Sequence, residues 1–112
     1  MADSPGIDKN GRVGNHANMK SEKLFHEKRV LRNGAIIEMV IWRLPSPVLG
    51  SLHGYKYRLY FGRAGTRIVG FDNERGKGDH KHIDGLETAY VFTTVDQLVA
   101  DFLSEVKRRL DR

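Results

Sequence analysis

The C-terminal end of the chain carries the feature that most limits the fold. Apolar residues recur there at steps of one, three or four positions: Val95, Leu98, Val99, Phe102, Leu103, Val106 and Leu110. This spacing places them along one side of an α-helix, which needs a partner surface to cover the apolar stripe. Thr94, with Gln97 three residues later, fits a capping box, so we expect the helix to run from Thr94 to Arg112.

The partner surface is predicted to be an antiparallel sheet. Strand patterns occupy residues 23–31, 35–44, 55–61 and 66–72, and residues 90–92 are a candidate for a short fifth strand. Asn33-Gly34 favours a tight hairpin turn with positive φ at both positions. We therefore expect an α+β fold, with an antiparallel sheet of four to five strands, built from two hairpins, and one C-terminal helix packed on one face.

Composition favours one folded domain. The 112 residues are enough for a single domain, which we place at 21–112. Residues 1–20 are dominated by Gly, Asn, Asp and Ser, so we expect a disordered N-terminal tail there. No apolar run is long enough to span a membrane, and the absence of cysteine excludes disulfides and thiolate metal sites. The absence of cysteine is compatible with the cytosol.

The charge of the chain is compatible with nucleic-acid binding. The net charge is +5, which attracts anionic partners, although many basic proteins have no such role. Lys56, Arg58 and Tyr60 alternate with Tyr55 and Tyr57, so they lie on the other face of their strand. Cations mixed with aromatic rings are typical of surfaces that bind single-stranded RNA.

The sequence FDNERGKGDHKH, residues 71–82, concentrates the ionisable groups. It has central glycines and no apolar periodicity, so it is predicted to be a loop that follows the strand at 66–72. His80 and His82 are two positions apart, and their imidazoles would point the same way if the segment were extended.

One interpretation of this stretch is metal-free cleavage of RNA. That reaction needs a base for the 2′-hydroxyl, an acid for the leaving oxygen and cations for the phosphate. Imidazole titrates near neutral pH, so His80 and His82 are the candidates for acid and base. The remaining candidates are Glu74 and Asp79 as orienting carboxylates, and Arg75, Lys77, Lys81, Lys56 and Arg58 as phosphate or RNA ligands. This interpretation needs neither a metal ion nor a cofactor.

Three alternatives stay open at this point. Asp79, His80 and His82 offer a carboxylate and two imidazoles to Zn²⁺ or Mn²⁺, as in a metal-dependent nuclease, although no fourth ligand is evident. The same loop suits a non-catalytic module that binds RNA or a partner protein. A solvated turn without any site has a similar composition.

Several segments resemble the TumE family of small prokaryotic toxins. They are LFHEKRVLRNGAIIEMVIWRLP, YKYRLYF, GFDNERGKGDHKH and YVFTTVDQLVADF. The resemblance runs from about Lys23 to Leu110, and its most specific part is the run from Asp72 to His80 with His82. The segment before Met19 departs from it.

The resemblance implies a cytoplasmic toxin of a two-gene toxin–antitoxin module. Its partner would be an antitoxin encoded by a neighbouring gene. The antitoxin, rather than this chain, would bind DNA, through a helix-turn-helix. Together with the residue chemistry, this predicts a toxin-like component of a type II module that acts as a metal-independent endoribonuclease. RNA is then a second partner, and a homodimer stays open.

Overall fold

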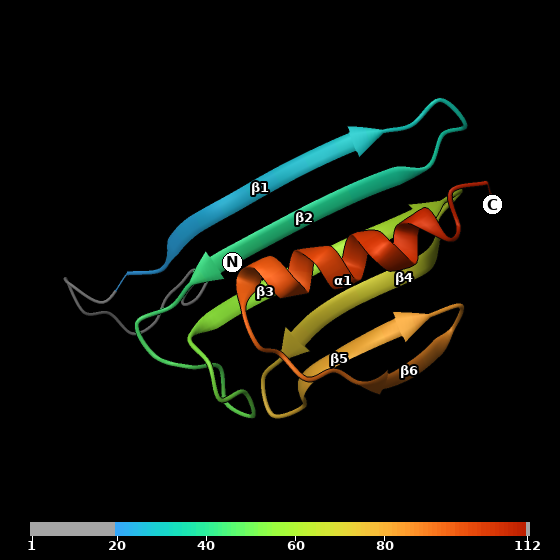
Figure 1. Ribbon diagram of the computed structural model, residues 1–112. Coiled ribbons are helices and arrows are strands. Elements are labelled where there is room, and N and C mark those ends of the chain that lie inside the picture. Colours follow the sequence, from blue (N-terminus) through green and yellow to red (C-terminus); the bar gives the residue numbers. More distant parts are fainter. Residues whose placement is uncertain (1–19, 112) are drawn as a thin grey trace.

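The computed structural model describes residues 20–111, which form one antiparallel sheet and one helix (Figure 1). The elements are β1 (Glu22–Val30), β2 (Ile36–Arg43), β3 (Tyr55–Arg63), β4 (Thr66–Glu74), β5 (Gly78–Ile83), β6 (Leu86–Ala89) and α1 (Val95–Lys107). The sheet order is β1-β2-β3-β4-β5-β6, so each strand pairs with its neighbours in sequence. The predicted tail at 1–20 lies, except for its last residue, outside the described residues. No helix within 20–111 is long and apolar enough to cross a membrane.

The α+β class is confirmed, but the predicted number of strands is wrong. The sheet has six strands, where four to five were predicted. The stretch 71–82 is not a loop: it ends β4, turns, and forms β5. Gly76 and Gly78 have φ of +80° and +79°, which lets the chain reverse tightly. Residues 90–92, predicted as a strand, follow the last strand instead.

The turns differ in part from the expectation. Only Gly34 of the Asn33-Gly34 pair has a positive φ, and the connection between β1 and β2 spans residues 31–35. Positive φ at two successive residues, as in a type I′ turn, occurs instead at Ala64 and Gly65 between β3 and β4, and at Asp84 and Gly85 between β5 and β6.

Helix α1 packs on one face of the sheet and closes the core there (Figure 1). Thr94 is the N-cap and accepts a hydrogen bond from the Gln97 amide at 3.0 Å, as predicted. Phe102 is fully buried and meets the Phe71 ring edge-on, with centroids 5.9 Å apart. Leu103, predicted in the buried stripe, is 40% exposed. The fully buried positions of the helix are Leu98, Phe102 and Val106, a narrower stripe than the sequence spacing predicted.

The two faces of the sheet carry different chemistry. On the helix side, Leu59 of β3 lies opposite Phe71 of β4, and both are buried. On the other side, Arg58 lies opposite Asp72, which lies opposite His80 of β5. No helix or strand of residues 20–111 packs on this second side, which we call the open face.

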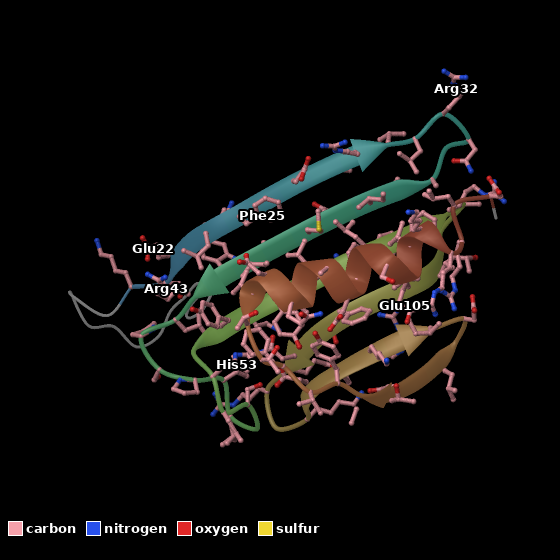
Figure 2. The ribbon with its side chains drawn as sticks, in the orientation of Figure 1. Glu22, Phe25, Arg32, Arg43, His53 and Glu105 are labelled. Atoms are coloured by element: carbon pink, nitrogen blue, oxygen red, sulfur yellow. The ribbon has the colours of Figure 1, made fainter. Side chains whose placement is uncertain are left out.

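Asp79, predicted as a site residue, belongs to the helix side. Its carboxylate accepts hydrogen bonds from Ser51 Oγ at 2.7 Å, Tyr57 OH at 2.7 Å and His53 Nε2 at 2.6 Å. His53, labelled in Figure 2, comes from the loop before β3, and its Nδ1 accepts the Tyr55 amide. Burial acts to raise the pKa of Asp79, but the three hydrogen bonds outweigh it and the pKa is lowered. The network therefore joins this loop to β5 and has a structural role.

We predict that the helix packing provides a large part of the stability. Phe102→Ala should lower the free energy of unfolding by about 3–5 kcal/mol, because it leaves a cavity between α1 and β4. Ser104→Ala, on the exposed side of the same helix, should change it by less than about 0.5 kcal/mol. Urea unfolding measures both, and equal effects would mean that another side of α1 is buried.

We also predict that Asp79 stabilises the fold. Asp79→Ala leaves three donors without their acceptor and should cost about 3–5 kcal/mol of unfolding free energy. Glu22→Ala removes an exposed carboxylate paired with Arg43 and should cost less than about 1 kcal/mol. A melting curve for Asp79→Ala that matches that of Glu22→Ala would contradict the structural role.

Candidate functional site

The open face brings together ionisable side chains from β4, β5 and β6. Alternate residues of a strand point to the same face, so Asp72 and Glu74 of β4 share it with His80 and His82 of β5. Glu87 of β6 lies directly opposite His82. We call these five residues the open-face cluster.

His80 lies at the centre of this cluster. Its side chain is only 5% exposed. Its Nδ1 donates to the Gly78 carbonyl at 3.1 Å. Its Nε2 lies 2.5 Å from Asp72 Oδ1 and 3.6 Å from both Glu74 Oε1 and Glu87 Oε2. Oxygens of three carboxylates thus converge on one imidazole nitrogen.

The closest of these contacts is not a hydrogen bond. Asp72 Oδ1 and His80 Nε2 are both buried, and neither has a hydrogen-bond partner among residues 20–111. Buried polar atoms are nearly always paired, so such a juxtaposition marks a site for a proton, an ion or a ligand. An imidazolium proton between the two atoms, or a bound cation, would balance the charge of the carboxylate.

His82 completes the imidazole pair. Its ring meets the His80 ring edge-on at 5.3 Å between centroids, so the two rings point the same way, as predicted for an extended segment. Its Nε2 lies 3.9 Å from Glu87 Oε1. Burial, and then the charge of Arg67, lower the pKa of His82. The lowered pKa favours the neutral form of the ring, in which one nitrogen carries a lone pair.

Two of the predicted cations lie on the open face beside the cluster. The Lys56 ammonium donates to the Asn73 carbonyl, and burial lowers its pKa even though Asp72 and Glu74 act to raise it. The Arg58 guanidinium lies over the Tyr60 ring, 5.5 Å from its centroid. This arrangement extends the polar surface from β5 across β3.

Three other predicted residues lie apart from the two imidazoles, and a fourth reaches the cluster from a turn. Asp79 and Lys81 point to the helix side, because neighbouring residues of a strand face opposite ways. Arg75 is exposed in the turn between β4 and β5. Lys77, in the same turn, reaches back to the cluster, with its Nζ 2.8 Å from Glu87 Oε2.

Sequence reasoning missed three residues of the site. Asp72 was inside the charged stretch but received no role, and Glu87 belongs to a strand that was not predicted. Arg67 lies across Gly70, where an added Cβ would come within 2.6 Å of its Cδ. A glycine inside a strand often marks such a close approach, so Gly70 was the available signal.

The cluster contains one set of atoms that could hold a metal ion. Asp72, His80 and His82 each offer one ligand atom, and these atoms lie within 4.8 Å of one another. Asp79, the carboxylate considered from the sequence, is not in this set.

One of three comparisons with known proteins supports the resemblance to the TumE family. A search of curated proteins and a search of solved structures each found no match. The family model described as Toxin TumE matches residues 3–110, which include the whole sheet and α1. The match also extends into the segment before Met19, so the expectation that this segment departs from the family was wrong. This match covers nearly the entire chain, and the chain therefore belongs to the TumE toxin family.

Proposed function

We propose that this toxin is an endoribonuclease that cleaves RNA at the open-face cluster without a metal ion. The observation that carries the proposal is the edge-on contact between two imidazoles, one backed by Asp72 and the other with a lowered pKa. A neutral imidazole accepts a proton and an imidazolium donates one, and cleavage beside a 2′-hydroxyl needs both steps. Perturbed ionisable groups gathered at one place are typical of active sites.

His82 suits the role of general base. It is the more accessible of the two rings, with 18% of its side chain exposed. It would take the 2′-hydroxyl proton while the 2′-oxygen forms a bond to phosphorus. His80 would give its Nε2 proton to the 5′-oxygen as the bond from phosphorus to that oxygen breaks, after a movement of the ring that exposes the buried Nε2 to the substrate. The products are a 2′,3′-cyclic phosphate and a 5′-hydroxyl.

Asp72 takes the orienting role that the sequence suggested for Asp79. Its Oδ1 faces the Nε2 of His80, while the Gly78 carbonyl holds the other nitrogen of the ring. A carboxylate in this position fixes the direction of the ring. Glu74 lies farther from the same nitrogen and adds to this effect.

Cations and rings around the cluster would bind the RNA strand. Lys56, Arg58 and Arg67 are candidates for the phosphates, since charge-assisted contacts to phosphate are strong. Tyr60 and Trp42 of the open face offer surfaces on which bases can stack, and Lys23 lies over the Trp42 ring at 5.1 Å.

Membership of a toxin family implies an antitoxin as a possible partner. We propose that this partner is a helix-turn-helix protein, that the pair forms a type II module, and that the toxin acts in the cytoplasm. The genes next to this one would test the module, because the antitoxin gene should be adjacent.

We predict that cleavage depends on both imidazoles of the cluster. His80→Ala and His82→Ala should each slow the cleavage of a labelled RNA by about 10²–10⁴-fold. His26→Ala is the matched control, because His26 also lies on the open face, on β1, where it pairs with Glu38. RNA with 2′-O-methyl groups should stay intact, and the products should end in a cyclic phosphate.

The controls separate the competing functions. If both folded variants cleave like His26→Ala, the pair is not catalytic and a binding module becomes the better account. Such a module should lose RNA affinity steeply with salt. Cleavage that stops on chelation and returns with Zn²⁺ or Mn²⁺ would replace the metal-free mechanism by a metal-dependent one.

A further inference from the structure

We propose that Asp72, His80 and His82 form a binding site for one divalent ion of a first-row transition metal, such as Zn²⁺ or Co²⁺. The inference rests on the geometry of the cluster, and it depends on the proposed ribonuclease function only for its effect on cleavage. It gives the cluster a second ligand besides RNA.

The first support is the state of the two closest atoms. Asp72 Oδ1 and His80 Nε2 are buried, lie 2.5 Å apart and make no hydrogen bond with residues 20–111. In the neutral ring, donation from Nδ1 to the Gly78 carbonyl leaves Nε2 with a lone pair directed at the cluster. A backbone carbonyl that holds the second nitrogen is the usual support for a metal-binding histidine.

The second support is the local excess of negative charge. Besides Asp72, the carboxylates of Glu74 and Glu87 each lie 3.6 Å from His80 Nε2. Lys77 pairs with Glu87 from the exposed rim, with 53% of its side chain in solvent. A compact divalent cation would compensate these carboxylates better than one flexible ammonium group.

The third support is a candidate for the fourth ligand. Glu87 lies between the two rings, with Oε2 3.6 Å from His80 Nε2 and Oε1 3.9 Å from His82 Nε2. Its side chain is 35% exposed, so it can move toward an ion. Two imidazoles and two carboxylates are a common donor set for tetrahedral Zn²⁺.

The donor set also selects the class of ion. Mg²⁺ and Ca²⁺ prefer sites made of oxygen atoms, whereas imidazole favours Zn²⁺, Co²⁺, Ni²⁺ or Cu²⁺. A bound ion would occupy the lone pairs that the two rings need for proton transfer. We therefore expect it to inhibit metal-free cleavage.

A titration of the full chain with Co²⁺ tests the site directly. Tetrahedral Co²⁺ absorbs strongly in the visible range, and we expect these bands to saturate at one equivalent and to disappear when Zn²⁺ is added. Asp72→Asn preserves side-chain size and His82→Asn keeps a polar side chain, and each should weaken binding at least about 100-fold. His26→Ala should bind as the wild type does.

Two results would overturn the proposal. One is the absence of saturable Co²⁺ bands in the folded wild type. The other is wild-type affinity in both Asp72→Asn and His82→Asn, with folding checked by circular dichroism, since this would place the ion elsewhere on the chain.

Cleavage assays distinguish a failure of the proposed metal site from a failure of the proposed ribonuclease function. Inhibition of cleavage by one equivalent of Zn²⁺ supports both the metal site and the metal-free mechanism. Activation supports the site and overturns the metal-free mechanism. Cleavage by a protein that binds no Co²⁺ overturns the site alone. Saturable Co²⁺ binding by a protein that never cleaves RNA supports the site and overturns the ribonuclease function.

Discussion

The packing of α1 on one face of the sheet determines the chemistry of the other face. Side chains alternate along each strand, so every residue of β3, β4 and β5 either meets the helix side or joins the open face. The helix side takes the apolar residues, with Phe71 and Phe102 in direct contact. The open face has no helix or strand of residues 20–111 to cover it, so it can carry charged groups without removing all of them from solvent.

The same alternation divides the side chains of β5 between the helix side and the open face. Asp79 points to the helix side and holds the loop before β3, while its neighbour His80 points to the open face. Lys81 returns to the helix side, and His82 joins His80. The rigid network around Asp79 thus fixes the strand that presents both imidazoles. A site on a strand fixed in this way keeps its geometry better than a site on a mobile loop.

Sequence patterns predicted the elements that bury apolar residues. The stripe of α1 and the cap at Thr94 were visible because they follow the helical period. Strands β5 and β6 were missed because they bury few apolar residues, and their position depends on glycine turns and ladder hydrogen bonds. The alternation of Asp72 with Glu74, and of His80 with His82, was the available sign of a hairpin.

The partner of His80 could not be predicted without the strand register. Asp79 is its neighbour in sequence but lies on the other face, whereas Asp72 is eight positions away and lies directly opposite it. Two turn glycines, Gly76 and Gly78, set this register by allowing positive φ. Spacing along the chain therefore predicted that the two imidazoles point the same way, and only the fold shows which carboxylate lies beside them.

The central claim is that RNA meets the open face at the two imidazoles. Imidazole carbon–proton NMR spectra of the full chain, recorded during titration with an uncleavable 2′-O-methyl oligonucleotide, test this claim most directly. The account predicts that the ring signals of His80 and His82 shift and saturate together, while that of His53, on the helix side, stays in place. Saturating shifts at His53, with unchanged signals from His80 and His82, would contradict it.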